Sequence, residues 1–174
     1  MKISGKTALL VSVGALFACL VLTGEARAQL YGSDENGNLF TISTTTGAAT
    51  PVGSAGALTG TAPSGCCTEI EYDNTTGRAW AQDRFGGNVI TEFDINTGLL
   101  IGPRVADGAA FNGLEYVGAV LYGVSKVGAG ASPSTLSTLD PTTGVVTPIG
   151  ATGVASLVGL AWDGATTMYA VDGV

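Results

Sequence analysis

Short runs in which apolar and polar residues alternate recur along the chain after residue 30. One full set comprises residues 114–117, 121–125, 136–139 and 145–149, and each run is bounded by Gly, Asp, Pro or Thr. Alternation with a period of two is typical of half-buried β-strands, and no 3.6-residue helical spacing follows residue 28. The pattern therefore predicts an all-β fold.

Two phrases repeat along the chain. LDPTTGVVTPIG (139–150) matches ISTTTGAATPVG (42–53), and FDINTGLLIG (93–102) is a shorter copy. EIEYDNTTGRAWAQD (69–83) aligns with GLEYVGAVLYGVS (113–125) and GLAWDGATTMYAVD (159–172). The repeat unit is about 45 residues long, and four strands in that length are typical of one β-propeller blade.

The recurring Thr-Gly segments predict tight turns between strands. In residues 140–144, the carboxylate of Asp140 accepts hydrogen bonds from following backbone N–H groups, and Pro141 presets φ. Gly144 then supplies the positive φ at which a bulged hairpin ends. Residues 43–47, 73–77 and 94–98 carry the same pattern. Asp34, Asn36 and Asn38 have the spacing of a calcium loop, but a plain turn is favoured because no later carboxylate follows suitably.

The segments LYGSD, LYGVS and MYAVD, followed by Asp-x-x-Thr-Gly turns and TPIG, resemble bacterial secreted β-propeller repeats. They are similar to the YVTN-type, quinoprotein-like superfamily and to uncharacterised secreted propeller families. The resemblance covers residues 30–174. It implies an architecture and no activity, since propellers host binding, scaffolding and several enzyme chemistries.

The strand count predicts an incomplete ring of about three four-stranded blades. Residues 30–53 supply three strands, residues 69–102 and 113–150 four each, and residues 159–173 two. Closed propellers commonly have four to eight blades. Truncation is the favoured interpretation; completion as a homo-oligomer through exposed blade edges and a closed three-bladed ring are the alternatives.

Residues 1–28 read as a signal-peptide helix. Lys2 and Lys6 precede an uncharged apolar run, and Ala26-Arg27-Ala28 is a small-x-small cleavage site. Lipidation at Cys19 and a retained anchor are the alternatives; the apolar run is short for a membrane span. Cleavage after Ala28 predicts a secreted or periplasmic protein, residues 29–174, that forms one partial β-propeller domain without a stable membrane span.

Composition excludes several functions. The formal net charge is −7, and an acidic surface repels phosphate backbones, so nucleic acid is not an expected partner. Histidine is absent, which removes Ser-His pairs, imidazole metal sites and a His general base. No cofactor, metal site or catalytic residue is predicted.

Long, irregular connections mark one end of the predicted sheets as the ligand face. The candidate residues there are Arg84, Phe85, Arg104, Phe111 and Lys126. The cations would suit an anionic ligand, and either phenylalanine would stack on a sugar or else serve as a plug beneath a loop. The expected ligand is a glycan, a small anion or a protein; ordinary exposed loop charges are the plainer explanation of the cations.

Cys66 and Cys67 are adjacent. A disulfide between them would be strained, because disulfides join Cα atoms at least about 4.4 Å apart, and neighbours lie about 3.8 Å apart. A vicinal disulfide, two free thiols and a link to a second molecule all remain open.

These features predict a non-catalytic secreted binding or scaffold protein of unknown ligand. The alternative is a fragment of a larger propeller enzyme whose catalytic blades lie elsewhere.

Overall fold

The computed structural model describes residues 29–34, 36–55, 58, 69–83, 87–126 and 133–173. These residues form thirteen β-strands and no α-helix, which confirms the all-β prediction for this part of the chain. The predicted signal peptide lies outside the described residues. Within them, no helix is long and apolar enough to cross a membrane.

The strands form four antiparallel sheets in which neighbours in sequence are neighbours in space. Sheet A contains β1 (Leu30–Ser33), β2 (Leu39–Ile42) and β3 (Ala49–Val52); sheet B contains β4 (Glu69–Asp73), β5 (Arg78–Asp83), β6 (Val89–Phe93) and β7 (Val105–Ala106). Sheet C contains β8 (Phe111–Val117), β9 (Val120–Lys126), β10 (Pro133–Leu139) and β11 (Val146–Ala155), and sheet D contains β12 (Leu157–Trp162) and β13 (Met168–Asp172). The four sheets contain three, four, four and two strands, which are the predicted numbers, although some strand bounds differ from those predicted.

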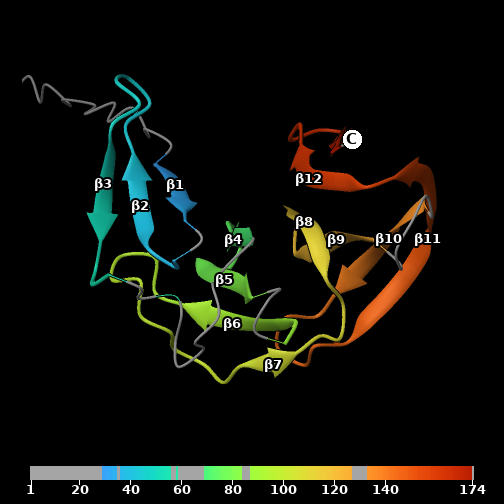
Figure 1. Cartoon of the computed structure of the whole chain (residues 1–174), viewed down its shortest axis with the longest axis horizontal. Helices are drawn as coiled ribbons and strands as arrows, with labels where there is room; N and C mark the ends of the chain where they lie inside the picture. Colours follow the sequence, from blue (N-terminus) through green and yellow to red (C-terminus); the bar gives the residue numbers. More distant parts are fainter. Residues whose placement is uncertain are drawn as a thin grey trace, which may run out of the picture.

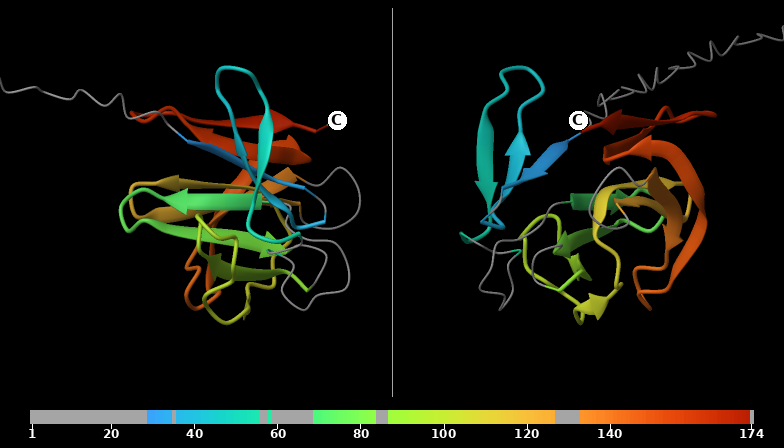
Figure 2. Two further views of the ribbon diagram at one scale, coloured as in Figure 1. Left: turned by 90° about the vertical axis from the view of Figure 1, so that its left-hand side faces the viewer. Right: turned by 45° about the vertical axis from the view of Figure 1, so that its right-hand side comes forward.

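The sheets follow one another along an arc. Figure 1 shows β1, β4, β8 and β12 toward its middle and β3, β7 and β11 toward its outside. β4 lies against β8, and β8 lies against β12. The sheets described here do not close into a ring, and Figure 2 shows the β2–β3 hairpin standing away from the other sheets.

Sheets A and C have the same strand register. The repeated phrases align β1, β2 and β3 with β9, β10 and β11, and the cross-strand partners correspond except at Leu136, where a bulge makes Gly150 the partner instead of Ile149. Leu30–Ile42 matches Leu121–Leu139, Tyr31–Thr41 matches Tyr122–Thr138, and Phe40–Pro51 matches Ser137–Pro148. The repeat therefore specifies pairing as well as strand position.

The predicted turn chemistry is confirmed. The carboxylate of Asp140 accepts a hydrogen bond from the backbone N–H of Thr142 at 2.9 Å, and the Gly144 N–H donates to the Asp140 carbonyl at 2.8 Å. Gly144 has a φ of 75°, and Gly47, Gly77 and Gly98 lie in the same left-handed region. Asp34 forms a plain turn, accepting from the backbone N–H groups of Asn36 and Asn38 at 2.9 Å each.

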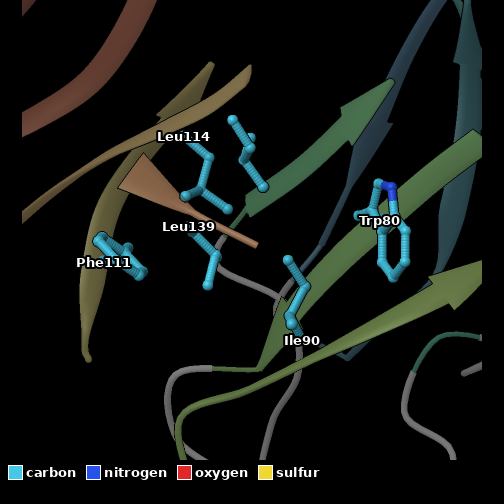
Figure 3. Close-up of a cluster of buried hydrophobic side chains, with 6 residues drawn as sticks. Trp80, Ile90, Phe111, Leu114 and Leu139 are labelled. Carbon is cyan, nitrogen blue, oxygen red and sulfur yellow. The ribbon is translucent and has the colours of Figure 1, made fainter. Parts of the chain in front are cut away.

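Two apolar clusters hold neighbouring sheets together. Leu39, Leu58, Ala79, Ala81 and Phe93 form the cluster of sheets A and B. Trp80, Ile90, Phe111, Leu114, Leu121 and Leu139 form the cluster of sheets B and C (Figure 3).

The fourth strand of sheet B differs from the predicted strand. Leu100 makes an isolated bridge to Phe93, Gly102 and Pro103 interrupt the pairing, and the chain rejoins β6 at β7. Residues 105–106 and 111–112, which the sequence placed in a loop, are therefore strand residues. Proline lacks the N–H that a continuous ladder needs, which explains the interruption.

Candidate functional site

The structure describes part of the predicted ligand face. Arg104 directly precedes β7, and Phe111 is the first residue of β8. Lys126 is the last residue of β9, and its side chain is not described. Arg84, Phe85, Cys66 and Cys67 lie outside the described residues, so their predicted roles stay predictions.

Arg104 forms an ion pair. Its Nη2 lies 2.8 Å from Oδ2 of Asp83, whose side chain is 7% exposed. The guanidinium is itself only partly exposed, and its charge is opposed by a buried carboxylate. An anionic ligand would have to compete with Asp83, which weakens the prediction that Arg104 recognises one.

Phe111 does not face a ligand, and its predicted role there needs correction. Its side chain is fully buried among Ile90, Leu114 and other apolar residues (Figure 3). The alternative interpretation, a plug beneath the loops, describes its position. The sequence predicted that the strand would begin at Gly113, the first residue of the repeated phrase, whereas β8 begins two residues earlier, at Phe111.

A polar cluster lies beneath this end of sheets B and C, and sequence reasoning missed it. It comprises Gln82 near the end of β5 and Asp107 after β7; Asp83 of β5 and Asn112 of β8 are also buried, and none of the four is more than 8% exposed. Nε2 of Gln82 donates to Oδ2 of Asp107 and to the carbonyl of Ala109, both at 3.0 Å. The cluster fixes the segment that joins β7 to β8.

Within the part of the chain that the structure describes, Oε1 of Gln82 and Oδ1 of Asn112 are buried without a hydrogen-bond partner. Burial raises the pKa of Asp107, although hydrogen bonds from Ala109 and Gln82 oppose that rise. Among the described residues, no group of three or more Asp, Glu, Cys or His side chains is arranged to hold a metal ion. The cluster supports the loops from below and presents little surface to solvent.

A groove between sheets A and B is open to solvent. Two adjoining hollows of about 470 and 170 Å³ share Gln29, Tyr31, Tyr72 and Ile95 in their walls. Ile70, Glu71 and Phe93 line the smaller one. The walls thus combine aromatic, aliphatic and carboxyl groups, which is typical of recognition sites.

The position of this groove follows from the repeat. In sheet C the first strand, β8, pairs with β9 and also lies against β12, so it fills the space between them. β1 corresponds to β9, and it lies beside β4 as β9 lies beside β12. Among the described residues no strand occupies the corresponding space between β1 and β4. The groove occupies that space.

β4, which lines the groove, and its neighbour β8 carry three half-buried carboxyl groups. Desolvation raises the pKa of Glu69 to about 7. Burial, together with the charges of Glu115 and Glu69, raises the pKa of Glu71 to about 9. The pKa of Glu115 is also raised by burial, against a hydrogen bond from the backbone of Trp162.

Glu92 shows how a cation changes such a carboxyl group. Arg78 donates to its two oxygens, from Nε at 2.8 Å and from Nη2 at 2.6 Å, and this contact lowers the pKa of Glu92. The Arg78 guanidinium also lies 4.5 Å from the centre of the Trp80 ring. No such cation acts on Glu71 among the described residues.

Comparison of the chain with protein-family models, with curated proteins and with solved structures gave no match. The groove, the inner carboxyl groups and the buried polar cluster are therefore interpreted from their own geometry.

Proposed function

We propose that this chain is a non-catalytic, secreted or periplasmic binding or scaffold protein built from propeller-type blades. The observation that carries the proposal is the groove between β1 and β4, where Tyr31, Tyr72 and Glu71 meet on a rigid sheet framework. Its ligand is a glycan, a small anion or a segment of another protein. Export rests on the pattern of residues 1–28.

Three features support blades of the propeller type. Each sheet is a meander whose strand order follows the sequence, sheets A and C have the same register, and β4, β8 and β12 lie next to one another. These features are expected when copies of one four-stranded unit are arranged around an axis.

The groove is favoured over the loop end as the ligand site. At the loop end, Arg104 is ion-paired, Phe111 is buried and the polar cluster is nearly inaccessible. In the groove, the Tyr72 side chain is 43% exposed and lies where a ligand would contact it.

Substitution of Tyr72 tests the proposal. Immobilised glycans, small anions and peptides are screened for binding to the purified chain, and the affinity of any ligand found is measured by calorimetry. We expect Tyr72→Ala to weaken binding about tenfold or more, because aromatic side chains dominate such contacts. Tyr169→Ala is the matched control, since Tyr169 is 59% exposed on β13 and does not line the groove. Absence of any ligand, or equal affinity of both variants, would contradict the proposal.

One observation favours the alternative of a fragment of a larger enzyme. Glu69 and Glu71 have raised pKa values and lie on one strand, and carboxyl groups of this kind serve as general acids or bases. A screen of the purified chain and of Glu69→Gln for hydrolase activity distinguishes a binding protein from an enzyme fragment. Activity that is present in the wild type and lost in the variant would support the enzyme fragment.

A further inference from the structure

We propose that the groove takes an extended peptide segment that joins sheet A beside β1 as its first strand, with a lysine or arginine placed next to Glu71. This inference rests on the proposed binding function and names its ligand class. The occupant is a basic, apolar segment of another protein rather than a second copy of this chain.

The edge of sheet A is suited to strand addition. β1 ends the sheet and pairs with β2 alone among the described residues, whereas the corresponding β9 has neighbours on both sides. An unpaired edge offers backbone N–H and C=O groups to an extended chain, and side-chain pockets beside it provide specificity. Leu30, at this edge, is 50% exposed, so an apolar side chain is available there for contact with an added strand.

Sheet C indicates which residue of the added strand faces which residue of β1. Glu115 of β8 lies opposite Tyr122, and Tyr116 lies opposite Leu121. Since β1 has the register of β9, the residue in the Glu115 position would lie opposite Tyr31. The next residue, in the Tyr116 position, would lie opposite Leu30.

The repeat also places that residue beside Glu71. Glu71 and Glu115 occupy the same position in β4 and β8, and the Glu115 charge acts on Glu71. In a strand added to sheet A, the residue at this same position would lie beside Glu71, on the side away from Glu115. Tyr31 and Glu71 line the same hollow, which agrees with this placement.

The charge at this position favours a basic residue. The titratable groups around Glu71 are Glu69 on its own strand, Glu115 and Tyr116 on β8, and Tyr31 across the hollow. Arg78 shows on Glu92 how a cation stabilises a carboxylate in this protein. The chain's own first strands carry Glu71, Glu115 or Ala161 at the position, and its net charge is −7, so a second copy is a poorer occupant.

Two synthetic peptides test the inference. The first, Gly-Leu-Lys-Tyr-Val-Gly, has the sequence of residues 113–118 with lysine in the Glu115 position; the second keeps the glutamate. Each carries a fluorophore, and its binding to the purified chain is followed by fluorescence anisotropy. We expect the lysine peptide to bind at least about tenfold more tightly, because its ammonium stabilises the ionised Glu71 carboxylate in a partly buried ion pair, whereas glutamate adds a further carboxyl group beside Glu71.

The variant Glu71→Gln keeps the shape of the side chain and removes its charge. We expect it to reduce the difference between the two peptides to less than about threefold, since the amide no longer distinguishes lysine from glutamate. Glu92→Gln is the control, because Glu92 pairs with Arg78 and does not line the groove; it should keep the preference. Wild-type affinity for the lysine peptide should increase as the pH rises toward about 9, where Glu71 ionises without a cation.

The possible results separate this inference from the proposed function. Equal binding of the two peptides, or a preference that persists in Glu71→Gln, overturns the inference. If Tyr72→Ala still weakens another ligand, the proposed function stands without it. Light scattering measures the molecular mass of the purified chain and tests whether a second copy is the occupant. A dimer that the peptides dissociate would also overturn the inference.

Discussion

Sheets A and C share three corresponding strands in nearly the same register, yet they differ at their inner edges. β9 pairs with β8, whereas β1 borders an open groove. Identical repeat positions therefore have different surroundings, as Leu121 and Leu30 show by their exposures of 1% and 50%. The comparison teaches that the repeat determines pairing within a sheet, while burial depends on the neighbouring sheet, since Leu121 packs in one cluster with Trp80 and Ile90 of sheet B.

The largest expected effect comes from truncating this leucine in both sheets. Leu121→Ala should lower the free energy of unfolding by about 3 kcal/mol, because it removes a buried side chain and leaves a cavity. Leu30→Ala should cost less than about 1 kcal/mol, because half of the side chain is already in water. Chemical denaturation measures both values. Similar losses in the two variants would mean that β1 is covered in solution.

The turn glycines sharpen the same comparison, with an expected difference between the two variants of about 2 kcal/mol. A Cβ at Gly144 would contact the Ala106 carbonyl oxygen, whereas a Cβ at Gly47 would meet nothing within 4 Å. Both residues have φ above 70°, so alanine is strained at either position by about 1 kcal/mol. Gly144→Ala should cost about 3 kcal/mol in all, since it also displaces backbone of sheet B. Equal melting temperatures for the two variants would show that the contact between sheets C and B is absent.

The smallest predicted effect is the pH dependence of stability. Glu69 and Glu71 have folded pKa values of about 7 and 9, both above the ordinary 4.5. Between pH 4.5 and 9 the unfolded chain therefore binds fewer protons than the folded chain, and stability falls as the pH rises. Asp140 acts oppositely: its pKa is lowered to about 2, so its contribution is present above its ordinary 3.8 and is lost as the pH falls toward 2.

The melting temperature should accordingly be highest near pH 4–5 and fall toward pH 9. The free energy of unfolding should fall by about 2 kcal/mol over this range, after allowance for solvent screening. Glu71→Gln should flatten the upper part of the profile. A profile that rises from pH 5 to 9 would contradict the burial of these carboxyl groups.

Sequence reasoning succeeded where the determinants are local. The Asp140–Gly144 turn depends on residues within one five-residue segment, and the two repeated phrases locate most strands. It failed at Phe111 and at residues 105–106, because pairing after Gly102 and Pro103 depends on β6 and on the neighbouring sheet.

The groove and its carboxyl groups were also beyond sequence reasoning. Alternation identified Glu69 and Glu71 as strand residues, but their raised pKa values arise from the packing of β4 against β8. Likewise, Gln82 reads as an ordinary polar residue, and only the three-dimensional arrangement buries it against Asp107.

The Phe111 ring lies so close to Gly123 that a Cβ there would come within 2.4 Å of it. Sheet B has Ala81 at the corresponding position, and sheet A has Gly32. The side chains at positions 111 and 123 consequently compete for the same volume, so a larger residue at one position requires a smaller residue at the other. We expect substitutions at these two positions to occur together in evolution, although each would be deleterious alone.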